Sequence, residues 1–475
     1  MPLTVTSRLL VVALLVGACS TTGTPGAVPQ SSAPPASAAP TTSAAPTATP
    51  TASATARTGT TAAVPSCPTY AAPDPDRPVL TADVTVRGRQ VTGTEHLVFT
   101  PDLAVTQLVF RLWAAAPVPA RSGSATAVTS ARVNGAAVTA HRPDPTTIRI
   151  SWSGRAGTPI TIDLGFTLTL PTGADERWGN RGSTSWFASG LPLLAWESGH
   201  GWATEPPTTQ FAEASTSEEM RLARLTVHHA AGLTALATGS PVRSDATTLV
   251  TSAPTVRDVA VTVGAFRVAH AMAGSVPVTV AVAPGLPDSP VTIAAEATRH
   301  LLRHVARFGP FPYAVVDLTV LPDIRGGIEY PGAILLGTAQ DKDATLSHEL
   351  AHQWFYGLVG DDQARDPWLD EAFATYAEGL DRGTAASYTG RRLQPSVLGR
   401  TGRPMTYWEG RPYYYQGVYV QGAAALLRAR ATHPRLFDAE VRCYVAHNAH
   451  RIARPGDVAR DLPLAVPQLR RAGAL

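Results

Sequence analysis

The sequence is poor in residues that build many kinds of site: its 475 residues include three cysteines, four methionines and one lysine, Lys342. So few cysteines exclude a disulfide-rich scaffold and a metal site made of cysteines. No apolar run reaches the roughly 20 residues that span a bilayer, so we expect no transmembrane helix. A large charge excess is also missing, because 39 Lys+Arg balance 36 Asp+Glu to a net charge of +3. This balance gives no indication of a nucleic-acid partner.

The N-terminus has the order of an export signal. A basic residue, Arg8, precedes the apolar run Leu9–Val16, and the run ends in Gly17-Ala18-Cys19. The order Val-Gly-Ala-Cys resembles the lipobox of bacterial lipoproteins, in which the cysteine receives a lipid and becomes the mature N-terminus. We therefore predict a lipoprotein signal peptide at residues 1–18 and a lipid on Cys19 that anchors the exported protein to the extracytoplasmic face of the membrane. A secreted protein with a chance cysteine is the alternative.

Two further composition changes divide the rest of the chain. Residues 19–68 are almost entirely Pro, Ala, Ser, Thr and Gly without apolar periodicity, which predicts a disordered stalk. Residues 69–284 contain short stretches that alternate with period two, so we predict an all-β saddle or sandwich. The clearest stretches are 80–86, 91–99, 107–113, 146–152, 160–170, 222–228 and 256–268.

Residues 285–475 change to an α+β pattern. Helical spacing over 290–307 is followed by strand patterns at 315–321 and 328–336. Three further helical stretches are expected at 344–358, 366–380 and 416–431.

One of these stretches contains the most informative motif, His348-Glu349-x-x-His352. The histidines are four residues apart, so on a helix both imidazoles reach one Zn²⁺ while Glu349 projects beside them toward a water. Glu371 follows His352 after eighteen residues and lies just after Asp366-Pro367, which predicts a helix start with Asp366 as N-cap. Two antiparallel helices would return this carboxylate to the histidines. Two histidines, one glutamate and a water form the open site of a catalytic zinc.

These motifs resemble the aminopeptidase N family of gluzincin zinc peptidases. The resemblance rests on His348-Glu349-x-x-His352, on Trp368-Leu369-Asp370-Glu371 and on Gly326-Gly327-Ile328-Glu329-Tyr330, which is similar to the family's exopeptidase motif. It implies a β saddle followed by a thermolysin-like catalytic domain. It also implies a zinc aminopeptidase with one Zn²⁺ per chain, acting on peptides with a free N-terminus. The sequence ends at Leu475, so it resembles a member without the family's large C-terminal helical domain.

The resemblance assigns a role to each motif residue. His348, His352 and Glu371 would hold zinc, and Glu349 would be the general base. Glu329 would bind the substrate's α-amino group, with Gly326 and Gly327 on the same substrate-binding strand.

A tyrosine is expected to stabilise the tetrahedral intermediate, and Tyr419 in Tyr419-Val420-Gln421-Gly422-Ala423 fits the family pattern better than Tyr414 does. Glu197 and Glu205 are only candidates for a second amine-binding residue.

Several alternatives stay open at this point. An open-cleft gluzincin endopeptidase would use the same motifs, and a peptide-binding lipoprotein would have lost the catalysis. His300 and His304 repeat the four-residue spacing, but we expect them to be surface or packing residues. Cys67 and Cys443 are the two cysteines left after lipidation of Cys19, and they would be either a disulfide or two thiols.

Overall fold

The structure is a computed structural model that describes residues 67–475 apart from 209–217 and 339–340. The predicted signal peptide, Cys19 and nearly all of the predicted stalk therefore lie outside the described residues. The described part belongs to one compact unit, Ala62–Leu475. In this part no helix combines the length and the apolar character needed to cross a membrane.

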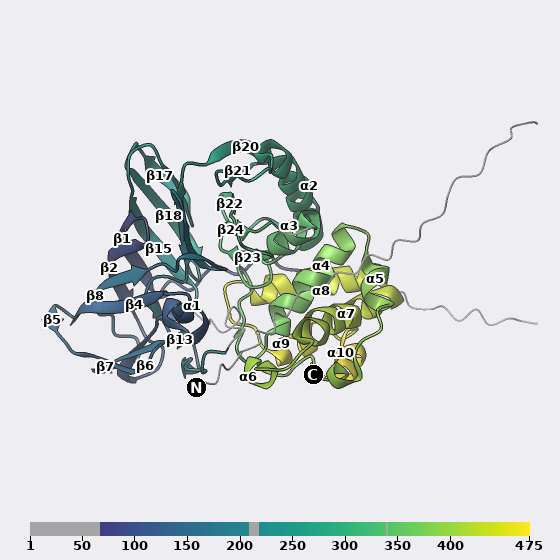
Figure 1. The fold of residues 1–475 in the computed structure, drawn as a ribbon. Coiled ribbons are helices and arrows are strands. Elements are labelled where there is room, and N and C mark those ends of the chain that lie inside the picture. Colours follow the sequence, from purple (N-terminus) through teal and green to yellow (C-terminus); the bar gives the residue numbers. More distant parts are fainter. Residues whose placement is uncertain (1–66, 209–217, 339–340) are drawn as a thin grey trace, which may run out of the picture. The chain divides into compact units, whose positions relative to one another are not determined.

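An eight-stranded sheet dominates the first part of the described chain, with the strand order β17-β18-β15-β1-β2-β8-β4-β5 (Figure 1). Its strands are β1 (Val79–Arg87), β2 (Gln90–Phe99), β4 (Ala125–Val133), β5 (Ala136–Ala137), β8 (Ile160–Thr169), β15 (Met220–His228), β17 (Ser240–Ser244) and β18 (Thr248–Val256). The predicted alternation is confirmed in β1, where Leu80, Ala82, Val84 and Val86 are all buried. The hairpin to β2 turns at Gly88, whose φ of 56° suits a residue without a Cβ.

Three smaller sheets complete the β-rich part, with the orders β10-β11-β19-β16, β12-β3-β7-β6 and β13-β14. Their strands are β3 (Val105–Arg111), β6 (Ala140–Asp144), β7 (Thr147–Gly154), β10 (Trp178–Arg181), β11 (Thr184–Ala188), β12 (Leu193–Leu194), β13 (Trp196–Glu197), β14 (Gly201–Trp202), β16 (Thr234–Ala237) and β19 (Ala260–Gly264). Short elements between them are β9 (Gly173–Asp175), η1 (Trp113–Ala115) and α1 (Pro117–Arg121). The stretch predicted at 256–268 is β-rich but is not one strand, because it contains the end of β18, all of β19 and the start of β20, which belong to three sheets.

A five-stranded sheet, with the order β20-β21-β22-β24-β23, opens the second part. Its strands are β20 (Arg267–Ala273), β21 (Val276–Val282), β22 (Val316–Val320), β23 (Gly327–Tyr330) and β24 (Ala333–Leu336). The boundary predicted at residue 284 cuts this sheet, since β20 and β21 precede it and β21 pairs in parallel with β22. The change of layer falls instead between β19 and β20.

The strand predicted over 328–336 is two antiparallel strands, β23 and β24. Pro331 and Gly332 form the turn between them, and Gly332 has a φ of 65°. The sequence carries a turn signal at Pro331-Gly332, which the prediction of a single strand overlooked.

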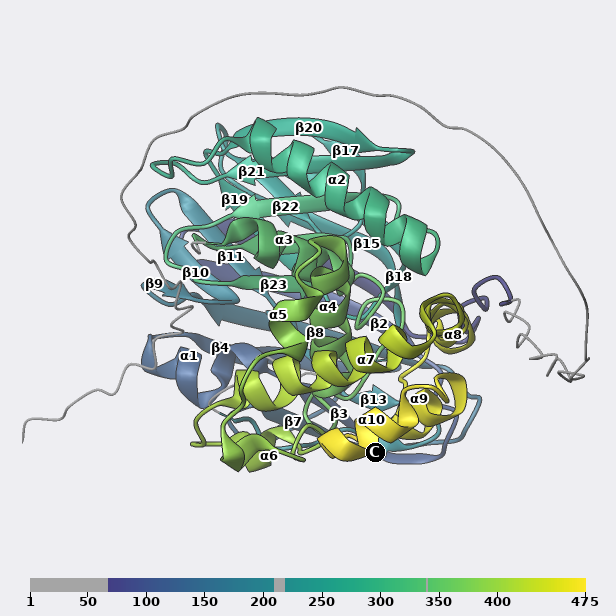
Figure 2. The ribbon, with the colours of Figure 1, turned by 90° about the vertical axis from the view of Figure 1, so that its right-hand side faces the viewer.

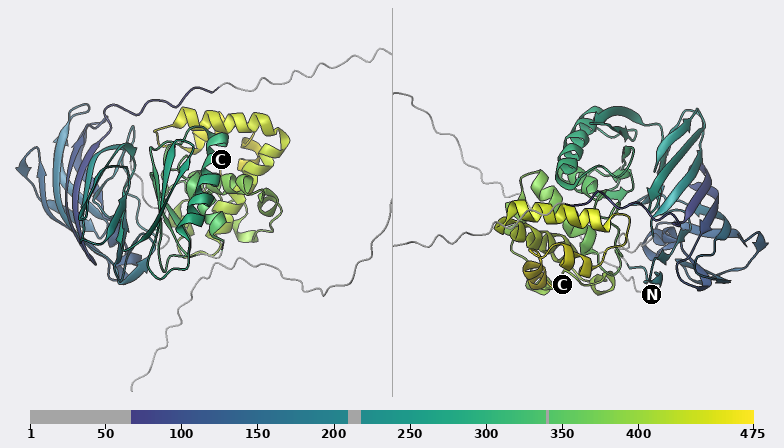
Figure 3. Two further views of the ribbon diagram at one scale, coloured as in Figure 1. Left: turned by 90° about the horizontal axis from the view of Figure 1, so that it is seen from above. Right: turned by 180° about the vertical axis from the view of Figure 1, so that it is seen from behind.

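Helices cover the five-stranded sheet and then form the C-terminal part. They are α2 (Pro290–Phe308), α3 (Lys342–Ala351), α4 (Trp368–Asp381), α5 (Ala385–Thr389), η3 (Pro395–Val397), α6 (Met405–Trp408), the π-helix η4 (Gln416–Val420), α7 (Gln421–Thr432), α8 (Pro434–Asn448), α9 (Pro455–Asp461) and α10 (Val466–Ala472). α2 lies across the strands of the sheet and packs on α3, which packs in turn on α4 (Figure 2). The helices from α7 onward gather in one group that contains the C-terminus (Figure 3). The predicted fold class, an all-β part followed by an α+β part, is confirmed.

A disulfide joins Cys67 to Cys443 on α8, with 4.8 Å between their Cα atoms. Three residues further on, the hydroxyl of Tyr70 donates to the carbonyl of Pro310 and accepts from Trp354 Nε1. The segment before β1 is therefore attached to the helical part. Of the two alternatives for the cysteines, the structure has the disulfide.

Candidate metal centre

Helix α3 carries the first histidine and ends just before the second. Asp341 caps its N-terminus by accepting from the backbone N–H of Ala344. The helix was predicted to continue to residue 358, but it ends at Ala351, and His352 is its C-cap. The chain then turns through Tyr356, whose φ of 109° is unusual for a residue with a side chain. The four-residue spacing of the histidines is unaffected.

Three side-chain atoms converge at this end of α3. His348 Nε2 lies 3.0 Å from His352 Nε2 and 3.1 Å from Glu371 Oε2, and His352 Nε2 lies 3.5 Å from the same oxygen. Ligands placed 2.0–2.1 Å from a tetrahedral zinc are separated by about 3.3–3.4 Å. The sides of the triangle, 3.0, 3.1 and 3.5 Å, are close to this separation, and its donor set of two imidazoles and one carboxylate suits zinc. The structure thus brings together the three predicted metal ligands.

The tautomer of His352 also suits a metal ligand. Its Nδ1 lies 3.1 Å from the carbonyl oxygen of Phe355, which can only accept a hydrogen bond. The proton of a neutral ring is therefore on Nδ1, and the lone pair of Nε2 faces the other two ligand atoms.

Glu371 comes from the first turn of α4. The predicted N-cap is wrong by one position, because Pro367 is the N-cap and no side chain caps the helix. Instead, Asp370 Oδ1 accepts from the backbone N–H of Glu371 at 2.6 Å. The positive end of the helix dipole favours the anionic form of both first-turn acids.

The charges at the site favour a cation. Burial alone would lower the pKa of His352, but the carboxylates of Glu329 and Glu371 outweigh it and raise this pKa well above its usual value. Burial would likewise raise the pKa of Glu371, but hydrogen bonds from the two histidines lower it. Negative charge that stabilises a proton on the imidazole would stabilise a bound metal ion in the same way.

Glu349 lies beside the triangle and is 4% exposed. Its Oε2 has no hydrogen-bond partner in the described structure. Burial, and after it the nearby Glu329, raise the pKa of this carboxyl well above its usual value. A Cβ added at Gly327 would lie 2.4 Å from Glu349 Cγ, so the glycine leaves the room that this side chain occupies.

Glu329 lies on β23, the last strand of its sheet. β23 pairs only with β24 among the described strands, so none of these strands lies along its other edge. Ile328 and Tyr330 point into a core shared with β11 and β19, so Glu329 points to the opposite face. There its carboxylate approaches Glu349 and His352 to within 4.8 Å. Of the two glycines predicted on this strand, Gly327 is its first residue and Gly326 lies just before it.

Tyr419 reaches the same place from the π-helix η4. Its hydroxyl donates to Glu371 Oε1 at 2.5 Å, and its ring stacks on His348 at 5.8 Å between centroids. π-helical turns are often found at functional sites. Tyr414 is buried and packs edge-on against Tyr419, one ring further from the histidines. Of the two candidates, Tyr419 is therefore beside the metal ligands.

Glu197, a candidate for amine binding, has other partners. Its carboxylate accepts from both Arg365 and Arg454 and is 3% exposed. Glu205 lies 3.8 Å from Arg365, whose guanidinium also pairs with Asp362. Both glutamates thus belong to an ion-pair network that joins the β-rich part to the start of α4, which argues against either as a free amine-binding group.

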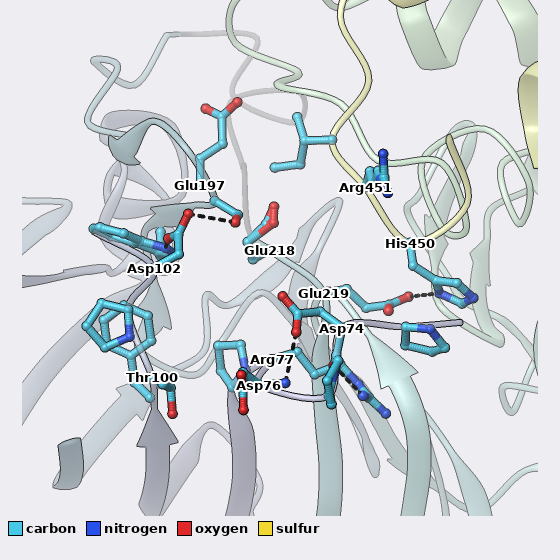
Figure 4. A pocket seen from close by; sticks show the side chains of 18 of the residues that line it. Asp74, Asp76, Arg77, Thr100, Asp102, Glu197, Glu218, Glu219, His450 and Arg451 are labelled. Atoms are coloured by element: carbon cyan, nitrogen blue, oxygen red, sulfur yellow. Dashed lines mark hydrogen bonds and ion pairs between the residues drawn. The ribbon is translucent and has the colours of Figure 1, made fainter. Parts of the chain in front are cut away.

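Glu197 also lines a cavity of about 600 Å³, together with Asp102, Glu218, His450 and Arg451 (Figure 4). Burial raises the pKa of Glu218 to about 7; Arg257 opposes this increase, and Glu197 and Asp102 add to it. None of the residues predicted as metal ligands, catalytic residues or exopeptidase motif lines this cavity.

His300 and His304 are packing residues. Both are buried, His300 bonds to Asp381 and Asp343, and His304 Nε2 lies 2.9 Å from the carbonyl oxygen of Ser347. Burial lowers the pKa of His304 to about 4, so its ring is neutral at pH 7. These contacts connect α2 to α3 and α4, the two helices that carry His348 and Glu371.

Three buried residues near the site were missed from the sequence. Arg257 donates to the carbonyl of Gly357 in the turn after α3. Gln353 and Gln363 bond to the strand that carries Glu329. Only Gln353 could have been suspected from the sequence, because it is adjacent to His352. Arg257 and Gln363 contact the site through segments that are distant in the sequence.

Sequence comparisons find aminopeptidases. The chain is 36% identical over 84 residues to endoplasmic reticulum aminopeptidase 1 of Homo sapiens and 35% identical over 81 residues to aminopeptidase N of Streptomyces lividans. Each match covers 14% of this chain, and 9% and 10% of the respective relative. The matched part thus spans about a tenth of these curated proteins. No protein-family model matches the chain.

Solved structures of M1 zinc metallopeptidases share the fold over nearly their whole length. A mutant from Deinococcus radiodurans bound to the peptide Tyr-Ser-Ala has a TM-score of 0.65 at 21% identity, with 84% of this chain and 94% of that chain covered. A two-domain M1 zinc metallopeptidase mutant bound to L-arginine gives 0.65 at 22% identity, with the same coverage. The resemblance to the aminopeptidase N family, predicted from the motifs, is confirmed by these relatives and by the shared fold.

Proposed function

We propose that this protein is a zinc-dependent aminopeptidase that removes N-terminal residues from peptides. The observation that carries the proposal is the convergence of His348, His352 and Glu371 beside a buried Glu349, with Glu329 next to them on β23, the last strand of its sheet. The first four residues are those that a metallopeptidase needs. Glu329 adds an anion at a fixed place, which is what recognition of an α-ammonium group requires.

The metal ion and the side chains would have different roles in the reaction. A zinc ion, one per chain, held by His348, His352 and Glu371 would supply a Lewis acid that lowers the pKa of water and polarises the scissile carbonyl. Glu349 takes a proton from the attacking water on its carboxylate and passes it to the leaving amine. A buried carboxylate with a raised pKa is suited to both transfers.

Two other side chains act on the substrate. Glu329 binds the free α-ammonium group while the outer edge of β23 pairs with the peptide backbone. The Tyr419 hydroxyl turns from Glu371 to donate to the oxyanion that develops on the scissile carbonyl.

Two variants test the roles of the base and of the ligands. Glu349→Gln should keep zinc but lose at least about two orders of magnitude in kcat on an aminoacyl fluorogenic substrate. His352→Ala should lose the metal itself, measured as zinc per chain after dialysis. Near-normal turnover of Glu349→Gln would remove this residue from the mechanism.

We also propose that the enzyme acts outside the cytoplasm, attached to the membrane by a lipid on Cys19 with residues 19–68 as a spacer. The lipobox-like Val16-Gly17-Ala18-Cys19 and the composition of the following segment support this location. Cys19→Ser should move the protein out of the membrane fraction. Retention of this variant in the membrane fraction would contradict the lipid anchor.

A further inference from the structure

The strand that presents Glu329 is weakly held by its own sheet. β23 has four residues and pairs only with β24 among the described strands. An exopeptidase needs its amine-binding carboxylate fixed relative to the metal to within about 0.5 Å. Contacts outside the sheet must therefore supply this precision.

Gln353 fixes the backbone of the hairpin. It directly follows His352, is 1% exposed, and points its amide at the turn between β23 and β24. Its Oε1 accepts from the N–H of Gly332 at 2.9 Å, and its Nε2 donates to the carbonyl of Tyr330 at 3.2 Å. The side chain thus acts like the peptide group of a neighbouring strand. It connects the residue after Glu329 to the residue after a metal ligand.

Gln363 fixes the carboxylate itself. Its Nε2 donates to Glu329 Oε1 at 3.3 Å and to Asp370 Oδ2 at 2.7 Å. Asp370 accepts in turn from the backbone N–H of Glu371. A continuous series of hydrogen bonds therefore runs from Glu329 to the backbone of a metal ligand.

The amide is well suited to the position of Gln363. It has two N–H donors, one for each of two buried carboxylates, and it adds no charge. A lysine or arginine here would neutralise Glu329 and compete with the substrate's ammonium group. An acid would leave three carboxylates in contact without a donor.

We propose that Gln353 and Gln363 are positioning residues that set the requirement for a free amino terminus, by fixing Glu329 relative to the metal ligands. This inference rests on the proposed aminopeptidase function. Neither glutamine is a predicted metal ligand or catalytic group. Gln353 holds the hairpin that carries Glu329 and also donates to the backbone carbonyl of Glu349 at 3.4 Å, and Gln363 holds the Glu329 carboxylate.

The test uses Gln353→Met and Gln363→Met, which keep the volume of the side chain but remove its hydrogen bonds. For each variant, kcat and KM are measured on an aminoacyl fluorogenic substrate and on its N-acetylated form. Calorimetry measures binding of the corresponding free amino acid and N-acetyl amino acid to the zinc-loaded protein. Asn448→Leu is the matched control, because Asn448 is also a buried amide and is bonded to the Tyr444 carbonyl and to Asp461, away from Glu329.

Both variants should lose at least tenfold in the ratio of kcat/KM between free and acetylated substrates. The loss should come mainly from a higher KM for the free substrate, together with weaker binding of the free amino acid. Zinc per chain should stay at the wild-type value, and the control should keep the wild-type ratio. If a methionine variant does not fold, Gln353→Asn or Gln363→Asn, whose shorter amide stays polar and uncharged but cannot reach the same partners, should show the same loss.

Two outcomes would overturn the inference, and they are distinguishable. A wild-type ratio in folded Gln353 and Gln363 variants, or a fall in kcat without a change in the ratio, would reduce the glutamines to structural residues. A wild type that cleaves both substrates equally would overturn the proposed function and this inference together.

Discussion

At the scale of single residues, the proposed site depends on how closely Glu349, the proposed general base, packs against β23, the proposed substrate-binding strand. The carboxylate of Glu349 occupies the space beside Gly327 in which any other residue would place its Cβ. Position 327, the second glycine of the motif, therefore requires a glycine for a steric reason, which the sequence alone does not reveal. Gly326 has no such reason, since a Cβ there would meet nothing within 4 Å.

Gly327→Ala should therefore lower kcat by about 100-fold, the scale expected for a catalytic group displaced by about 1 Å. Zinc content should be unchanged, because the three metal ligands do not contact the new methyl group. Steady-state kinetics on an aminoacyl substrate measure the effect, and Gly326→Ala should lose far less. Equal losses in the two variants would show that the space beside Glu349 is not the cause.

Asp317, on β22, gives a prediction about stability. Burial raises its pKa to about 7, although a hydrogen bond from Thr279 lowers it. The folded state thus binds a proton in a pH range where the unfolded chain, with an ordinary aspartate, does not. The stabilisation that the protonated Asp317 contributes is complete below about pH 4, the pKa of an aspartate in the unfolded chain. It is lost as the pH rises through about 7, the pKa in the folded state.

Asp317→Asn should remove that pH dependence. When the pH is lowered from 8 to 5, the free energy of unfolding of the wild type should increase by more than about 1 kcal/mol relative to that of the variant. Denaturant unfolding of both proteins at the two pH values measures the difference, and the other titrating groups contribute equally to each. Parallel pH profiles would contradict a raised pKa at Asp317.

At the scale of elements, the turn after α3 determines how His352 is presented. This turn provides the Phe355 carbonyl that fixes the His352 tautomer. Arg257, from the β-rich part, is 2% exposed and donates to the carbonyls of Gly357 and Arg451. A Cβ on Gly360 would lie 2.3 Å from Arg257 Cζ, so the turn is packed around the guanidinium.

Arg257→Met should weaken zinc binding by tenfold or more, as is typical when a group that supports a metal ligand is lost. Competition with a chelator of known affinity measures the dissociation constant. Arg442→Met is the matched control, because Arg442 also donates to backbone carbonyls, those of Arg307 and Ala306, but at an exposed position. Equal zinc affinities in the two variants would remove Arg257 from the support of the site.

The sequence predicts what depends on local periodicity. The spacing of His348 and His352 and the alternation in β1 follow from neighbouring residues, and the structure has both. The β23–β24 hairpin was predicted as one strand because most residues beside the turn are apolar, although Pro331-Gly332 is itself a turn signal. The partners of Glu197 and the bonds of Gln363 were inaccessible, since they join segments that only the tertiary fold brings together.

At the scale of the whole molecule, the disulfide between Cys67 and Cys443 closes a loop over a sequence separation of 376 residues. It attaches the segment before β1 to α8, so the start of the described chain is held on the helical part. Cross-linking stabilises mainly by restricting the unfolded chain, and the effect increases slowly with loop length.

Replacing both cysteines by serine should lower the free energy of unfolding by about 2–5 kcal/mol. Activity at moderate temperature should remain, because in the described part of the chain neither cysteine is hydrogen-bonded to a predicted site residue. Thermal unfolding of the variant and of wild type with and without reductant measures the effect. A wild type whose melting temperature does not respond to reductant would contradict a stabilising bridge.

We propose that a bound zinc ion and Glu329 together direct hydrolysis to the free end of a peptide. The most direct test is the ratio of kcat/KM for an aminoacyl fluorogenic substrate and its N-acetylated form, measured with the zinc-loaded wild-type protein. We predict a preference of at least about 100-fold for the free amine, in line with the loss of a buried charge-assisted contact. We also predict that a chelator removes the activity and that added zinc restores it. Equal rates on the two substrates, or activity that survives removal of the metal, would contradict the account.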